Sequence, residues 1–337
     1  MSPTIRDVAR RAGVSATTAS RVLGGSDHPV AAEVRQRVLQ AAQELDFTAN
    51  AYARGLSKGD FRLIGLVIPD IRDPYFVEIA RGVEDLASGA GYLVVLCNTD
   101  RDPARERRYV EELRAMRASI ILTGGGINRE AHLADLVSHP APIVVIGRHE
   151  LPFSSVQIDN VQGAIDATEH LIGLGHRRIA FLSGPLTSAT ATDRLEGFRQ
   201  AMARHRLAVE ERLVVEGDFS TEGGSRGLRQ LLESPSVPTA LFAANDQMAL
   251  GVLREARRRE LRVPEDIAVA GFNDIASASE TFPPLTTVHL SLRRIGQMAA
   301  ELLLKQVKTG QEERVSVLVR GELVVRESTV SSPTDPS

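Results

Sequence analysis

The chain has 337 residues, a hydrophobic content of 43% and a formal net charge of −3 at pH 7. This length predicts two or three domains rather than a single hydrophobic core. No apolar run reaches the roughly 20 residues of a membrane-spanning helix, and the N-terminus lacks the apolar stretch of a secretory signal. We therefore expect a cytoplasmic protein that does not enter a membrane. The single cysteine, Cys97, excludes an internal disulfide, and its apolar surroundings predict a buried, unreactive thiol.

The charge is unevenly distributed along the chain. Residues 1–58 carry eight basic and five acidic side chains, so this segment is positive although the whole chain is negative. A small basic head on an acidic body is consistent with DNA binding, but so modest an asymmetry does not establish it.

Residues 5–23 predict two short helices joined by a tight turn. Apolar side chains recur on one face of each helix: Val8, Ala9 and Ala12 in the first, and Ala19, Val22 and Leu23 in the second. Gly13 lies at the turn, where a positive φ is needed, and Ser15 can cap the second helix. The opposite face of the second helix carries small or polar groups and one long cation, which suits the major groove of DNA. An ordinary amphipathic hairpin of helices is the alternative interpretation.

Two further segments complete the N-terminal region. A third helix is predicted over residues 33–45, long enough to close a small core with the first two. In residues 50–58, Asn50 can cap a helix but Gly55 weakens it, so we interpret this segment as a hinge helix that forms conditionally. A flexible tether is the alternative.

From residue 63 onward, predicted strands alternate with predicted helices. Eight apolar strands fall in two groups: Leu63–Ile68, Tyr92–Cys97, Ile120–Leu122 and Ile143–Ile146, then Ile179–Leu182, Leu213–Val215, Ala240–Ala243 and Ile267–Ala270. A last helix near 292–307 precedes a strand pair at 315–319 and 322–326. Continuously apolar strands alternating with helices predict parallel sheets covered on both faces. The expected fold is a small all-α helix-turn-helix head followed by two doubly wound α/β lobes.

Eight motifs, in order along nearly the whole chain, resemble the lactose-repressor (LacI/GalR) family of bacterial transcription factors. They are Ile5–Leu23, Asn50–Leu56, Ile64–Phe76, Gly175–Pro185, Arg194–Phe198, Ala244–Gly251, Val263–Asp274 and Pro283–Val288. The resemblance implies lobes similar to periplasmic sugar-binding proteins. The domains expected on this basis are a head (1–48), a hinge (49–60), a first lobe (61–160 and 290–328), a second lobe (161–289) and a disordered tail (329–337).

The resemblance also implies a function. It is that of a homodimeric transcriptional regulator, expected to be a repressor, that binds a near-palindromic operator in double-stranded DNA. The matched DNA-binding positions are Thr4, Ser15, Ala16, Thr17, Thr18, Ser20 and Arg21 in the head, and Asn50, Ala53 and Leu56 in the hinge. Arg21 suits guanine and the hydroxyls suit phosphate, whereas Leu56 matches a leucine that enters the minor groove.

Three residues depart from the family pattern in the DNA-binding region. Ala19, Ala31 and Ala49 stand where the family usually has valine, serine and proline. The changes remove some core packing, a helix cap and a constraint on the unbound hinge. They predict weaker or more conditional DNA binding than is usual in the family.

A small effector, expected to be a sugar or sugar derivative, is implied to bind between the lobes and to change the operator affinity. The matched effector-binding positions are Tyr75, Phe76, Arg148, Arg194, Phe219, Asn245, Asn273 and Asp274. Arginine, polar groups and aromatic faces are what an anionic or polyhydroxyl ligand requires. Many sugar-responsive members have a carboxylate where this chain has Asn273, a difference that bears on which ligand is recognised.

Two other classes of function remain as alternatives. A nucleotide-dependent enzyme is one, but the chain has no Gly-x-Gly-x-x-Gly after the first strand, no P-loop and no nucleophile elbow. His170 and His176 are six residues apart, not the three or four that place two ligands on one helical face, so no metal or cofactor is expected. The other is a cytoplasmic small-molecule binding protein without operator control, which shares the two lobes but needs no DNA-binding head.

Overall fold

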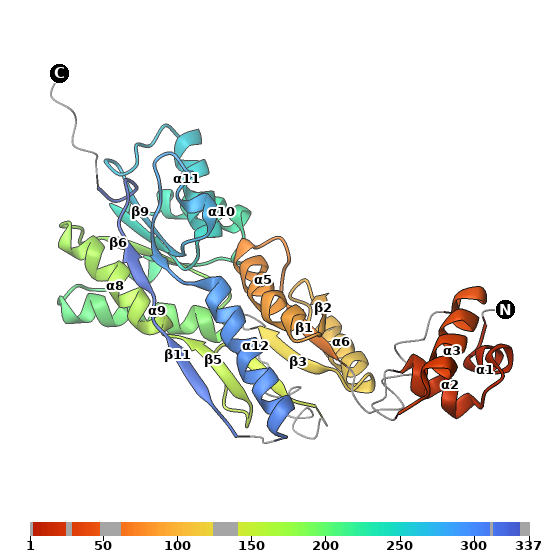
Figure 1. Cartoon of the computed structure of the whole chain (residues 1–337). Coiled ribbons are helices and arrows are strands. Elements are labelled where there is room, and N and C mark those ends of the chain that lie inside the picture. Colours follow the sequence, from red (N-terminus) through yellow and green to blue (C-terminus); the bar gives the residue numbers. More distant parts are fainter. Residues whose placement is uncertain (1–2, 25–28, 48–61, 124–140, 311–312, 331–337) are drawn as a thin grey trace. The chain divides into compact units, whose positions relative to one another are not determined.

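The structure is a computed structural model that describes residues 3–24, 29–47, 62–123, 141–310 and 313–330 (Figure 1). The chain divides into two units, Met1–Arg62 and Leu63–Ser337. The predicted hinge, with Asn50, Ala53 and Leu56, lies outside the described residues.

In the described part of the first unit there are three helices: α1 (Ile5–Ala12), α2 (Ala16–Leu23) and α3 (Ala32–Glu44). Their apolar faces meet in one small core: Val8, Ala9, Ala12, Ala19, Val22, Val38, Ala41 and Ala42. The predicted helix pair and third helix are therefore confirmed. A core so rich in alanine lets the helices approach closely, but it buries little apolar area.

Capping interactions set the ends of these helices. Gly13 has φ 64° at the end of α1, and Ser15 Oγ accepts a hydrogen bond from the Thr18 backbone N–H at 3.0 Å. Thr4 and Asp7 form a capping box at the start of α1. At the start of α3, Ala31 provides no side-chain cap. The missing cap costs about 1 kcal/mol relative to serine.

The first lobe of the second unit is a six-stranded sheet in the order β11-β5-β4-β3-β1-β2, with every pair parallel. Its strands are β1 (Leu63–Ile68), β2 (Leu93–Asn98), β3 (Ser119–Thr123), β4 (Ile143–Ile146), β5 (Ser154–Ile158) and β11 (Ser316–Val319). Leu66 and Ile68 face a core shared with α5 (Pro74–Gly89) and α12 (Leu292–Thr309). Val67 faces the opposite core, with α6 (Pro103–Ala115). Helices therefore cover both faces, as the apolar strands predicted.

The second lobe repeats this architecture in the order β12-β10-β9-β8-β6-β7. Its strands are β6 (Ile179–Ser183), β7 (Val214–Glu216), β8 (Ala240–Ala243), β9 (Ala268–Asn273), β10 (Thr286–His289) and β12 (Glu322–Val324), with β12 antiparallel to β10. Its helices are α8 (Asn160–Gly173), α9 (Ala189–Arg204), α10 (Thr221–Leu232) and α11 (Asp246–Arg258), with short 3₁₀ turns at Glu211–Leu213 and Ala276–Ala278. Helix α8 packs with α9 and α10 packs with α11 (Figure 1).

One predicted domain boundary is wrong: residues 290–328 were all assigned to the first lobe, but they contribute to both sheets. Strand β11 pairs with β5 in the first sheet, but β12 pairs with β10 in the second. The residues around β12 therefore belong to the second lobe rather than the first. The predicted tail also begins too early, because Thr329 is buried and its hydroxyl lies 2.8 Å from Thr286 Oγ1.

The described chain passes between the two lobes after β5, after β10 and after β11. Within each sheet the parallel strands all end on the same side. The loops that follow these carboxyl ends carry polar residues that line the space between the lobes. None of the helices in the described part of the chain has the length and hydropathy that crossing a bilayer requires.

Candidate functional site

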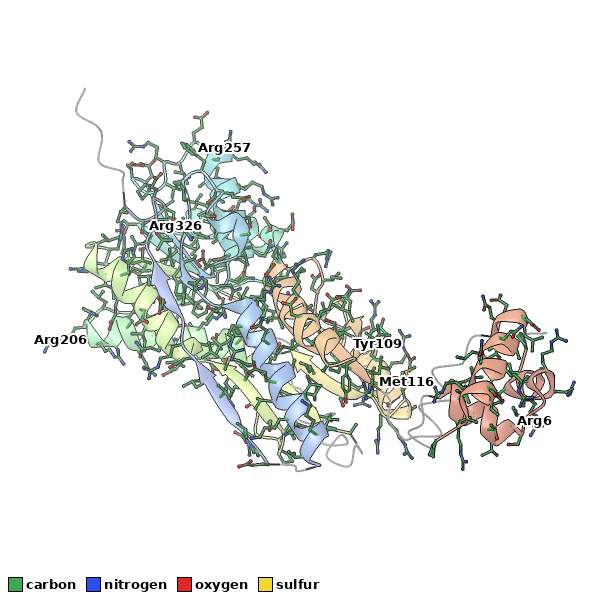
Figure 2. All side chains as sticks on the ribbon, viewed as in Figure 1. Arg6, Tyr109, Met116, Arg206, Arg257 and Arg326 are labelled. Atoms are coloured by element: carbon green, nitrogen blue, oxygen red, sulfur yellow. The ribbon has the colours of Figure 1, made fainter. Side chains whose placement is uncertain are left out.

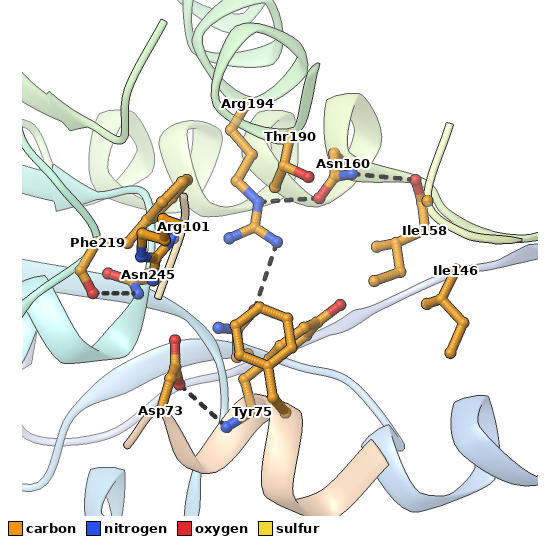
Figure 3. A pocket seen from close by; sticks show the side chains of 13 residues that line it. Asp73, Tyr75, Arg101, Ile146, Ile158, Asn160, Thr190, Arg194, Phe219 and Asn245 are labelled. Atoms are coloured by element: carbon orange, nitrogen blue, oxygen red, sulfur yellow. Dashed lines mark hydrogen bonds between the residues drawn. The ribbon is translucent and has the colours of Figure 1, made fainter. Parts of the chain in front are cut away.

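A pocket lies between the two lobes (Figure 3). Its lining comes from both of them: Asp73, Tyr75, Phe76, Arg101, Ile146, Gly147 and Ile158 from the first, and Asn160, Thr190, Arg194, Phe219, Asn245 and Asn273 from the second. Six of the predicted effector-binding residues are brought together here: Tyr75, Phe76, Arg194, Phe219, Asn245 and Asn273. The cavity volume is about 40 Å³, room for a few water molecules.

Arg194 is the central charged group of the pocket. It projects from α9, is 2% exposed, and its guanidinium carbon lies 3.6 Å from the centroid of the Phe272 ring. Nε donates to Asn160 Oδ1 at 2.9 Å and Nη2 to Asn273 Oδ1 at 3.4 Å, while Nη1 donates to the carbonyl oxygen of Ala244. Burial lowers the pKa of Arg194 to about 10, which leaves the side chain charged at neutral pH.

Two asparagine side chains that line the pocket form hydrogen bonds with other groups of the protein. Asn245 caps α11, with its Oδ1 accepting from the Met248 backbone N–H at 3.0 Å and its Nδ2 donating to the Phe219 carbonyl oxygen at 3.1 Å. Asn160 receives the Arg194 hydrogen bond and donates through Nδ2 to the Ile158 carbonyl oxygen at 3.3 Å (dashed in Figure 3). These hydrogen bonds position the guanidinium of Arg194 and the backbone at Phe219.

The first lobe contributes an acid and an aromatic pair. Asp73 caps α5 by accepting from the Tyr75 backbone N–H at 3.0 Å, and burial raises the pKa of Asp73 to about 6. The rings of Tyr75 and Phe76 pack edge to face with centroids 4.9 Å apart. Arg101 lies over the Phe219 ring, 5.6 Å from its centroid. The pocket thus combines two cations, one weakly acidic carboxyl group and aromatic surfaces.

Asp73, Arg101, Asn160 and Thr190 line the pocket but were not among the predicted effector-binding residues. A signal existed for Asp73, since an aspartate before proline is a typical start for a helix. No local pattern distinguishes the other three, which reach the pocket only because the two lobes face each other.

The structure places Arg148 and Asp274 outside the pocket lining, so their contact with an effector stays a prediction. Arg148 forms a bidentate ion pair with Asp193 of α9, at 3.1 Å from Nε and 3.0 Å from Nη2. The pair joins the two lobes, but Arg148 is half exposed, so its contribution is at most about 1 kcal/mol. Asp274 instead pairs with Arg326 at 2.7 Å and with His289 at 2.9 Å, which ties β9 to β10 and β12.

In the first unit, the predicted DNA-facing residues of α2 share an exposed surface. Ala16, Thr17, Ser20 and Arg21 are exposed, whereas Ala19 and Val22 are buried. The hydroxyls of Ser15 and Thr18 lie 2.9 Å apart, and Thr4 bonds to Asp7 within the capping box. Arg6 adds an exposed cation on α1 (Figure 2).

A three-helix head with a polar, exposed second helix, joined in one chain to two lobes with a pocket between them, defines a ligand-binding transcription regulator. Comparison with known proteins agrees. Residues 4–50 match the bacterial regulatory proteins of the lacI family, and residues 168–329 match a periplasmic binding protein-like domain. The chain belongs to the LacI family.

Individual relatives resemble this chain along almost its full length. The HTH-type transcriptional regulator DegA of Bacillus subtilis (strain 168) is 34% identical over 336 residues, which cover 98% of both proteins. The Lac repressor dimer bound to operator and the anti-inducer ONPF has a TM-score of 0.85 and 32% identity, covering 98% of this chain and 100% of that one. The complex of the regulator CelR with cellobiose has a TM-score of 0.73 and 33% identity, covering 97% and 99%. These relatives are regulators, so the enzyme alternative is rejected.

Proposed function

We propose that this protein is a cytoplasmic transcriptional repressor, associated with the nucleoid when bound to DNA, whose operator affinity is controlled by a small ligand held between its lobes. The observation that carries the proposal is the presence, in one chain, of an exposed polar helix α2 and a pocket built around the buried Arg194. A binding protein without operator control would have no use for the first of these features.

In this proposal α2 lies in the major groove. Arg21 reads a guanine edge, Ala16 and Thr17 approach neighbouring bases, and hydroxyl groups bind phosphates. The phosphate contacts are assigned to Thr4, Ser15, Thr18 and Ser20. The hinge positions Asn50, Ala53 and Leu56 complete the contacts, with Leu56 in the minor groove. Few strong base contacts per head mean that useful affinity requires two heads.

A homodimer supplies the second head, and the apolar surface of the body supports it. Leu93, Val95 and Leu96 in the edge strand β2 are 66%, 39% and 37% exposed, and Phe282 in the second lobe is 93% exposed. Exposed apolar groups of this size at an edge strand are typical of protein interfaces. The Lac repressor neighbour is a dimer on its operator, and a two-fold dimer matches a near-palindromic site.

Control by a small ligand follows from the position of the pocket. Ligand bound between the lobes changes their separation, and DNA affinity changes with it when the two arrangements differ in how they present the heads. The CelR neighbour binds cellobiose, which supports a sugar or sugar derivative as the ligand here. The proposed contacts are Tyr75, Phe76, Arg194, Phe219, Asn245 and Asn273.

A gel shift on the DNA upstream of the protein's own gene tests the proposal. We expect a retarded complex that resists competition by unrelated DNA and weakens steeply with salt, because lysine and arginine displace counterions from phosphates. A complex with 6–10 phosphate contacts loses roughly 10³- to 10⁵-fold in affinity between about 50 and about 200 mM salt. If no sequence-specific complex forms at low salt, with or without candidate ligands, the proposed function is wrong.

A further inference from the structure

We propose that the ligand is a sugar acid whose carboxylate pairs with Arg194, rather than a neutral sugar. This inference rests on the proposed function and makes it more specific.

Every hydrogen-bond acceptor that Arg194 contacts among the described residues is neutral. They are two amide oxygens, of Asn160 and Asn273, and the carbonyl oxygen of Ala244. Among the described residues, no carboxylate oxygen lies within 4.0 Å of the guanidinium. A buried charge without an opposite charge is costly, and a ligand that supplies the opposite charge removes that cost.

The nearest carboxylates are each engaged elsewhere. Asp193 is held by Arg148, and Asp73 accepts from the backbone of Tyr75. Asp246 accepts from Thr287 Oγ1 at 2.6 Å and from the Ile275 backbone N–H at 2.9 Å. These groups act on Arg194 only through space, so the local positive charge of the pocket is not neutralised by a direct partner.

The hydrogen-bonding groups left for a ligand are mostly donors. A guanidinium has more N–H groups than the three acceptors around Arg194 engage, and Arg101 adds a second guanidinium. The oxygen atoms of Asn160, Asn245 and Asn273 already accept hydrogen bonds within the protein. A site rich in donors selects a ligand rich in acceptors, as a carboxylate is.

The N-terminus of α9 points to the same chemistry. Thr190, in its first turn, lines the pocket, and the buried hydroxyl oxygen of Ser188 at its N-cap has no hydrogen-bond partner among the described residues. The first turn of a helix favours negative charge through its unpaired N–H groups. Together with Arg194, four residues after Thr190 on the same helix, this end of α9 is suited to an anion.

The remaining walls exclude a bare inorganic anion as the preferred ligand. Tyr75, Phe76 and Phe219 give aromatic surface, and Ile146 and Ile158 give aliphatic surface. Such walls bury the carbon face of a ring, while the donors bind its oxygen atoms. A pyranose ring bearing a carboxylate satisfies both requirements.

Asn273 is the residue that sets this preference. Its Oδ1 accepts a hydrogen bond from Arg194 Nη2 at 3.4 Å, so an aspartate there would give the guanidinium a permanent partner. The variant Asn273→Asp has nearly the same size and shape. The new carboxylate should neutralise the charge of the Arg194 guanidinium and so remove the preference for an acidic ligand.

The test compares paired compounds on the full-length protein at constant ionic strength, by thermal shift and calorimetry. D-glucuronate and D-galacturonate are paired with D-glucose and D-galactose, and glucose 6-phosphate is a third kind of probe. We expect at least one acid to raise the Tm and to bind more tightly than its neutral partner by roughly 30-fold or more. In Asn273→Asp this advantage should disappear, while the Tm without ligand is kept or raised.

Three results would overturn the inference: a neutral sugar that binds as tightly as its acid, no acid that binds, or binding by the sugar phosphate alone. Retention of the acid preference in a folded Asn273→Asp variant would also overturn it. Operator binding is measured on the same ligand-free samples. Its presence leaves the proposed function standing whichever ligand result is obtained, and its loss would count against that function instead.

Discussion

Replacement of Arg21 by alanine is expected to weaken binding of the dimer to its operator by between about 30-fold and about 10⁴-fold. A bidentate contact from arginine to guanine is worth about 1–3 kcal/mol of discrimination, and a dimer makes the contact twice. The side chain is exposed and lies away from the buried residues Ala19 and Val22, so the fold of the head should not change. Fluorescence anisotropy with labelled upstream DNA measures the effect.

The matched control is Arg35→Ala, which removes the same charge from an exposed position on α3. It should lower affinity only slightly, and equally for specific and unrelated DNA, because a distant charge acts through general electrostatics. The Arg21 variant should instead lose discrimination between the operator and a version altered at the contacted guanine. Equal losses in the two variants would show that Arg21 does not read a base.

Replacement of Arg194 by methionine is expected to weaken sugar-acid binding by roughly 150- to 5,000-fold, because removing one partner of a buried ion pair costs about 3–5 kcal/mol. Methionine retains much of the side-chain length and can still pack on the Phe272 ring. Calorimetry with D-glucuronate and D-galacturonate measures the loss. The affinity of the ligand-free variant for the operator should stay within a few-fold of the original protein, since the first unit is unchanged.

Arg101→Met serves as the comparison for this variant. Arg101 is less buried than Arg194 and contacts the ring of Phe219, so its removal should reduce acid binding by a smaller factor. Undiminished acid binding by Arg194→Met, with its operator affinity intact, would show that the carboxylate binds elsewhere.

Most of the fold was predictable from the sequence because apolar strands and amphipathic helices have distinct periods. Strands β5 and β10 were missed because their buried residues are largely polar. Ser155 Oγ donates to Ser316 Oγ at 3.1 Å, and Thr287 Oγ1 donates to Asp246. At these positions, hydrogen bonds between residues distant in sequence replace apolar packing. The local sequence has no pattern that predicts such bonds.

The placement of β12 shows a different limit. Strands β11 and β12 are separated only by Arg320 and Gly321, a spacing that resembles a hairpin, yet they belong to different sheets. A short connection that crosses between lobes cannot be distinguished from a turn by its sequence. The pairing is determined by which sheet edge each strand reaches.

Pocket residues could be predicted where they also belong to a local sequence motif, such as a helix start. Asn245 begins a helix and Arg194 lies in a recognisable helical motif, and both line the pocket. Arg148 was predicted as an effector contact because its position after the fourth predicted strand matches an effector-binding position of the family. Its partner Asp193 lies 45 residues away, and such a pairing becomes visible only when both lobes are in place.

The most direct test of the central claim is a measurement of coupling between the two ligands of the protein. Operator affinity is determined with and without a saturating concentration of the acid that raises the Tm, and acid affinity is determined with and without operator DNA. We expect both affinities to change by the same factor, about 5- to 150-fold, because coupling between two sites is reciprocal. An operator affinity that does not change while the acid is demonstrably bound would contradict control of DNA binding by the pocket.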